Sequence, residues 1–200
     1  MAEARGGPTS NVTAAVAARC DELAGGAQRA RSSDARLFAR LVAAREVRGE
    51  LALLGLSPRQ LAGVFGRHFA AGAQPLPTAD EVTVIVDERY AAFVVAMQSL
   101  LMGFASPDVD RDDMAAIATI VAHACLRPDH LWRDLGLGGR DDVTAMLDRF
   151  FPALVARNVD GMRWKKFLAR ELALATGATP GPSPGCPGCE DFGFCFPAAH

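Results

Sequence analysis

The chain has little of what marks several large protein classes. Its 200 residues include eleven Phe but only two Trp and one Tyr, and the 23 acidic residues outnumber the 21 Lys and Arg, for a net charge of −2. Contact with nucleic-acid phosphates usually requires a basic excess, so we expect no nucleic-acid partner. The most apolar stretch, residues 91–105, is interrupted by Gln98 and Ser99. It is shorter than the roughly 20 residues that span a bilayer, so we expect no membrane partner.

The first residues, MAEARGGPTSN, have no apolar centre of the kind that directs export. We therefore expect a cytoplasmic protein. Five cysteines in that reducing compartment favour metal binding over disulfides.

The sequence also lacks strand–turn–strand patterns and fixed-period repeats. Hydrophobic residues make up 50% of the chain and charged residues 22%, which excludes wholesale disorder. Ala, Leu and Val dominate, and apolar residues recur at spacings of three and four. The predicted fold is all-α, a single helical bundle-like domain with an irregular cysteine-rich C-terminal tail. Helices are expected over residues 12–23, 33–42, 58–69, 78–101, 114–125, 131–135, 143–150 and 161–175. Ser33 is expected to cap the second, Ser57 followed by Pro58 to start the third, and Thr78 and Glu81 to form a capping box at the fourth.

Composition divides the chain into three parts. Residues 1–10 are small and polar, and we expect disorder there. Residues 11–176 form the helical domain. Residues 177–185 (GATPGPSPG) cannot extend a helix and indicate a linker, so residues 177–200 are predicted to be a metal-binding tail that is structurally separate from the body.

Cys186, Cys189 and Cys195 follow the linker with the spacing C-x2-C-x5-C. Two thiolates three residues apart can bind one metal ion, or neighbouring irons of a cluster, from one tight turn, and the third can close the site. Soft sulfur ligands favour zinc, copper(I) or an iron–sulfur cluster. One alternative is a set of loose thiols. Another is a structural zinc site, whose fourth ligand is supplied by one residue of the set His200, Asp191 and Cys125.

Several blocks of the sequence resemble the NifQ family, the molybdenum donor of nitrogenase cofactor assembly. The tail matches through GMRWKKFLARELA followed by PSPGCPGCEDFGFCF, and RPDHLWRDLGL and RFFPALVARN match further upstream. LFARLVAAREVRGELALLGL is a weaker match. The resemblance implies an iron–sulfur cluster that carries molybdenum, with the nitrogenase cofactor-assembly scaffold and nitrogenase reductase as partners and a cytoplasmic role in nitrogen fixation.

The chain departs from the family at one position of the cysteine pattern. The family has C-x4-C-x2-C-x5-C, and the first cysteine position is Gly181 here. A three-iron cluster needs one external ligand for each of its three irons, so three thiolates are enough to hold it. Molybdenum in the vacant corner of such a cluster takes its outer ligands from oxygen or nitrogen donors. We therefore expect a cluster of the three-iron or molybdenum-three-iron type.

His130 lies in the matched block HLWRDLGL, and we consider it a ligand of molybdenum or of the cluster, with Asp134 supporting it. The alternative interpretation is structural. In it, His130 is a partnered histidine at a helix start, Trp132 is a core residue, and Asp134 caps a helix or pairs with Arg133 or Arg140.

Arg163, Lys165 and Lys166 surround Trp164 on the last long helix. Molybdate carries two negative charges, so these cations are candidates to bind it or to steer it toward the cluster. The alternative is a solvated helix face whose lysines balance nearby acids.

No nucleophile with its base, phosphate-binding glycine loop or catalytic carboxylate pair is recognisable, so we expect a carrier and not an enzyme. The leading hypothesis is an iron–sulfur protein that processes molybdenum and donates it to nitrogenase cofactor assembly. The competing hypotheses are a zinc-stabilised helical module for protein interaction and a small iron–sulfur redox protein.

Overall fold

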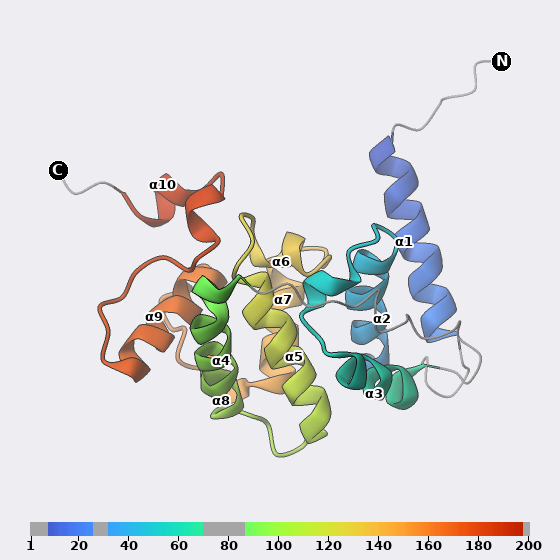
Figure 1. Cartoon of the computed structure of the whole chain (residues 1–200), viewed down its shortest axis with the longest axis horizontal. Coiled ribbons are helices and arrows are strands. Elements are labelled where there is room, and N and C mark those ends of the chain that lie inside the picture. Colours follow the sequence, from blue (N-terminus) through green and yellow to red (C-terminus); the bar gives the residue numbers. More distant parts are fainter. Residues whose placement is uncertain (1–7, 26–31, 70–86, 198–200) are drawn as a thin grey trace.

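The computed structural model describes residues 8–25, 32–69 and 87–197. These residues form α-helices and short 3-10 helices without a β-strand, which confirms the predicted all-α class (Figure 1). None of the described helices is long and apolar enough to cross a membrane. The elements are α1 (Pro8–Ala24), α2 (Ser33–Glu46), η2 (Leu51–Leu54), α3 (Pro58–His68), α4 (Glu88–Met102), α5 (Arg111–Ala124), α6 (Leu131–Asp134), α7 (Arg140–Phe150), α8 (Pro152–Val155), α9 (Trp164–Thr176), η4 (Cys186–Gly188) and α10 (Phe192–Cys195).

The helix starts follow local capping chemistry. The Ser57 side chain accepts from the backbone N–H of Gln60, and the Gln60 side chain accepts from the Ser57 N–H. Pro58 is the first residue of α3, as predicted for a proline that directly follows a capping serine. The cap of α2 is Ser32, which accepts from the Ala35 N–H, and not its neighbour as predicted. A serine can cap only from the position whose backbone is still extended, and here that is the first serine of the pair.

Other boundaries differ from the predicted ones at chain ends and in short elements. The first helix begins at Pro8, inside the segment for which composition predicts disorder. The last long helix begins at Trp164, three residues later than predicted, and α8 was not predicted. The expected capping box at residues 78–81 and the apolar residues up to 86 lie outside the described residues.

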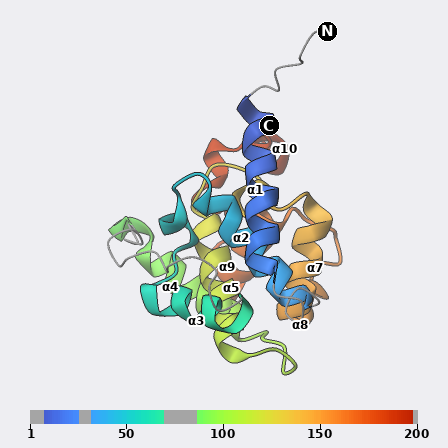
Figure 2. The ribbon, with the colours of Figure 1, turned by 90° about the vertical axis from the view of Figure 1, so that its right-hand side faces the viewer.

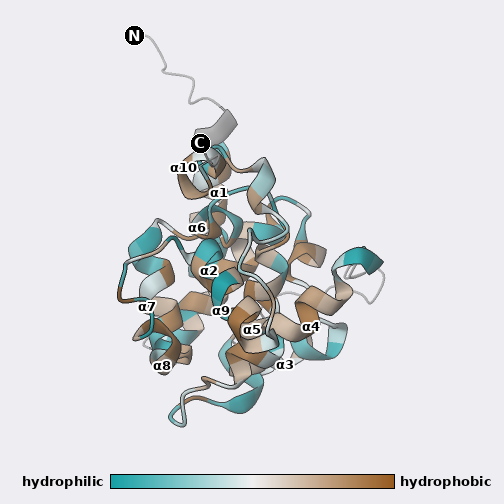
Figure 3. Ribbon diagram, turned by 90° about the vertical axis from the view of Figure 1, so that its left-hand side faces the viewer, coloured by the Kyte–Doolittle hydropathy of each residue, from teal (hydrophilic) through white to brown (hydrophobic). Residues whose placement is uncertain are grey.

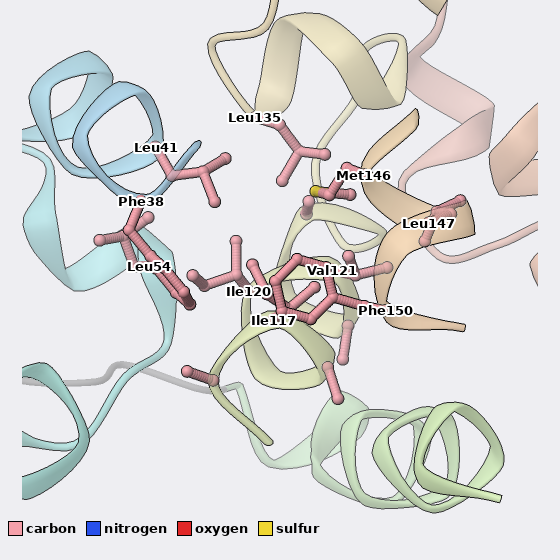
Figure 4. Close-up of a cluster of buried hydrophobic side chains, with 14 of the residues drawn as sticks. Phe38, Leu41, Leu54, Ile117, Ile120, Val121, Leu135, Met146, Leu147 and Phe150 are labelled. Atoms are coloured by element: carbon pink, nitrogen blue, oxygen red, sulfur yellow. The ribbon is translucent and has the colours of Figure 1, made fainter. Parts of the chain in front are cut away.

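α5 is the central helix of the body. Eleven of its residues are buried, from Asp113 to Ala124, because other helices surround it. Phe38 of α2 and Phe150 of α7 meet the apolar face of α5 at Ile117 and Ile120 (Figure 4). Hydrophobic residues concentrate on α4 and α5, and the more hydrophilic segments lie toward the helix ends and loops (Figure 3). α1 packs along α2, and its N-terminal end extends past the body (Figure 2).

Gly136 ends the short helix α6 and places the residues of that helix beside the site described below. Its φ is +68°, and a Cβ built on it lies 2.1 Å from the Cβ of Ala44 on α2. The position therefore requires glycine for two reasons: its backbone is left-handed, and two segments approach too closely for a Cβ.

Gly136→Ala is expected to lower the free energy of unfolding by about 2–4 kcal/mol, from left-handed strain and overpacking together. Urea denaturation measures this. Gly161→Ala is the matched control, because its φ is +60° and a Cβ there meets no atom within 4 Å. The control is expected to lose about 1–2 kcal/mol from strain alone. Equal losses in the two variants would contradict the close contact with α2.

Candidate metal centre

The predicted site residues come together around one pocket. Its volume is about 200 Å³, and it lies between the start of α6, the first turn of α9 and the C-terminal tail. The lining includes the seven residues that the sequence predicts to bind the cluster or molybdate: Cys186, Cys189, Cys195, His130, Arg163, Lys165 and Lys166. We call this cavity the cysteine pocket.

Apolar side chains form much of the wall of the cysteine pocket. They come from the three segments that enclose it and from α7: Leu131, Trp132, Val143, Trp164, Phe192 and Phe196. Such a wall limits the access of water and oxygen to whatever the thiols bind, and it strengthens electrostatic interactions inside the pocket.

The sequence predicts a tail that is structurally separate from the body. In the structure, residues 177–197 of the tail instead pack on the body. Ser183 is fully buried, and its Oγ donates to the carbonyl oxygen of Cys125 at 2.7 Å. The Gly185 N–H donates to the same oxygen at 3.0 Å. The tail and the body are so close at Gly185 that no side chain fits there, since a Cβ on Gly185 would lie 2.0 Å from the Arg127 carbonyl oxygen.

Ion pairs join the rest of the tail to the body. Arg163 pairs with Asp191 at 2.7 Å, and Arg133 pairs with Glu190 at 2.9 Å. These pairs are partly exposed, so each contributes on the order of 1 kcal/mol or less. Their main effect is to orient the tail.

Lys166, one of the predicted molybdate-binding cations, also contacts the tail. Its Nζ donates to the carbonyl oxygen of Cys195 and lies 5.0 Å from the centroid of the Phe196 ring. Arg163 lies over Phe194 in the same way, at 5.1 Å. Both cations therefore hold the third cysteine's segment in place.

His130 lines the pocket at the N-cap position of α6, and its side chain makes no capping hydrogen bond there. Its Nε2 is 3.2 Å from Asp191 Oδ2 and 3.4 Å from Glu190 Oε1, both in the tail. The ring stacks on Trp132 with an interplanar angle of 15°. The histidine is thus partnered at a helix start, and a ligand role for it stays a prediction.

Lys165 is buried and is not part of a solvated face. Its Nζ donates to Asp134 Oδ2, which is also buried. Asp134 accepts from Arg127 as well, at 3.3 Å, so its ion-pair partners are Arg127 and Lys165 and not the two arginines expected from the sequence. Nothing in the sequence indicates this burial, because a lysine within a basic run is normally exposed.

The thiols differ in environment. Burial raises the pKa of Cys125 to about 11. This thiol therefore stays protonated and behaves as a small buried hydrophobe. Burial also raises the pKa of Cys186, and a hydrogen bond from Ser183 and the charge of Lys165 oppose that rise. Only Cys186 of these two lines the cysteine pocket.

Within the described residues, no group of three or more His, Cys, Asp or Glu side chains is arranged to hold a metal ion. Of the proposed fourth zinc ligands, Asp191 lines the cysteine pocket and Cys125 does not. His200 lies outside the described residues. Gly181 also does not line the pocket, and a Cβ there would meet no atom within 4 Å.

Fold and site together define an all-helical protein whose cysteine-rich tail closes a pocket lined by thiols and cations. The sequence model of the NifQ family matches residues 35–197, and the chain belongs to this family. No solved structure matches the chain.

Curated relatives match over different lengths. A NifQ homologue of Sinorhizobium fredii is 35% identical over 144 residues, which are 71% of this chain and 60% of that protein. The NifQ protein of Rhodobacter capsulatus is 33% identical over 72% of this chain and 76% of its own length. That of Azotobacter vinelandii is 48% identical over 41% of this chain and 42% of its own length. The chain thus matches about half the length of the Sinorhizobium and Azotobacter relatives.

Proposed function

We propose that the protein is a molybdenum carrier that holds an iron–sulfur cluster in the cysteine pocket and donates molybdenum to the assembly of the nitrogenase cofactor. The observation that carries the proposal is the convergence of Cys186, Cys189 and Cys195 on one pocket in a chain of the NifQ family. Its proposed partners are the nitrogenase cofactor-assembly scaffold and nitrogenase reductase, as the family implies.

The donor set fits an iron–sulfur cluster. Thiolates are the ligands that such clusters take from proteins, and three thiols of one short tail line the pocket. The three are not arranged around a metal position in the described residues, so the tail would have to draw them together on binding. Three thiolates match the three irons of a three-iron cluster, and Gly181 supplies no fourth. When bound, the cluster supplies sulfide as ligands for molybdenum, which is the cargo.

The other pocket residues suit this role. Thiolate ligands bring negative charge, and the nearby Arg163, Lys165 and Lys166 offset it, although each already has a partner. Burial raises the pKa of Cys186, so its thiol holds its proton more tightly than an exposed one. A cluster binds the thiolate, so cluster binding must release this proton. None of these residues is asked to make or break a bond, which is consistent with a carrier and not an enzyme.

Anaerobic purification with analysis of iron, sulfide, molybdenum and zinc tests the proposal. We expect iron and labile sulfide in stoichiometric amounts, with molybdenum after loading from molybdate under reducing conditions. One equivalent of zinc without iron or sulfide would support the zinc-stabilised interaction module instead. A cluster that cycles electrons but transfers no molybdenum to an acceptor protein would support the redox alternative.

A further inference from the structure

The ammonium group of Lys165 has no free donor. It carries three N–H groups, and its Nζ donates to Asp134 Oδ2, to the carbonyl oxygen of Asp129 and, at 2.7 Å, to the carbonyl oxygen of Arg127. The side chain is only 7% exposed. A fully bonded, buried ammonium cannot contact an oxyanion without giving up one of these bonds, so a direct role in molybdate binding does not follow from its place in the pocket.

Two of the three acceptors are backbone carbonyls of one segment, residues 127–129, which we call the platform. The cysteine turn of the tail rests on the same segment. A Cβ on Gly185 would lie 2.0 Å from the Arg127 carbonyl oxygen, and a Cβ on Gly188 would lie 2.4 Å from the Cβ of Pro128. The glycines on either side of Cys186 are thus in close contact with the platform.

We propose that Lys165 is a positioning residue for the cysteine pocket, because it locks the platform on which the turn carrying Cys186 and Cys189 packs. The ligand role of the two cysteines rests on the proposed function, whereas the packing does not. Among the described residues of α9, only Lys165 donates to the carbonyl oxygens of the platform. The Arg127 side chain ties the platform to Leu53 and to the carbonyl oxygen of Asp134, but not to α9. Loss of the ammonium is expected to free the platform and with it the cysteine turn.

Alkylation of the metal-free protein tests the proposal without requiring a cluster. Each cysteine is followed by mass spectrometry during reaction with iodoacetamide, with Cys20 of α1 as the internal reference. Cys186 is 7% exposed and should react slowly in the unaltered protein. In Lys165→Met we expect it to react about tenfold faster relative to Cys20, because local opening exposes it.

Asp134→Asn is the matched control. It removes the charge that pairs with both Lys165 and Arg127, but it leaves both platform carbonyls as acceptors for Lys165. We expect the alkylation rate of Cys186 to stay near that of the unaltered protein. An unchanged rate in Lys165→Met, or equal increases in the two variants, overturns the proposal. If the Met variant does not fold by circular dichroism, Lys165→Gln replaces it, with an increase in the same direction expected.

Iron content of the same variants separates this proposal from the proposed function. If the unaltered protein binds no cluster, the proposed function fails while the alkylation result stands. If it binds one, Lys165→Met is expected to retain several-fold less iron per chain than Asp134→Asn. Equal iron retention in the two variants counts against the positioning role.

Discussion

Replacing Cys186, Cys189 or Cys195 singly by alanine is expected to abolish the visible iron–sulfur absorbance and to remove most of the bound iron. Only three thiols line the cysteine pocket, so each loss leaves one metal position without its ligand. The far-ultraviolet helical signal is expected to stay near that of the unaltered protein, because the core around α5 is built from other residues.

The chain contains two matched controls for this experiment. Cys20 lies on α1, away from the pocket, and Cys125 lies beside the tail without lining the pocket. Cys20→Ala and Cys125→Ala are expected to keep their iron. Full iron content in any one of the three tail variants would refute the three-thiolate assignment, and loss of iron in Cys125→Ala would make that thiol a ligand.

Gly185→Ala is expected to reduce iron retention several-fold without unfolding the body. The φ of Gly185 is −81°, which any residue adopts, so the effect comes only from space. The added Cβ would meet the carbonyl group of Arg127 at 2.0 Å from its oxygen, and backbone cannot yield as a flexible side chain does. The tail must move away, and the bond from the Gly185 N–H to the Cys125 carbonyl is lost with it.

The measurement is iron per chain after anaerobic reconstitution, with circular dichroism as the check on folding. Gly181→Ala and Gly193→Ala are the controls, because a Cβ at either position meets no atom within 4 Å. Both are expected to match the unaltered protein. A Gly185→Ala variant with the same iron content as these controls would show that the tail can bind its metal without docking on the body.

Side-chain patterns made much of this protein predictable. Apolar periods indicated the long helices, and the clustered thiols and the basic run on the last long helix indicated residues that line one pocket. The docking of the tail was not predictable, because it rests on backbone contacts at Gly185 and on the buried Ser183, which leave no periodic signal. The separate roles of the cations were hidden for a similar reason. Lys165 and Lys166 are neighbours in sequence, but helix geometry buries the first and turns the second toward the tail.

The central claim is that molybdenum is carried on an iron–sulfur cluster held by the cysteine pocket. X-ray absorption at the molybdenum edge, on anaerobically loaded protein, tests it most directly. We predict sulfur and iron among the nearest neighbours of molybdenum, and loss of both in Cys186→Ala. A spectrum with oxygen neighbours alone, or one that is the same in Cys186→Ala, would contradict the account.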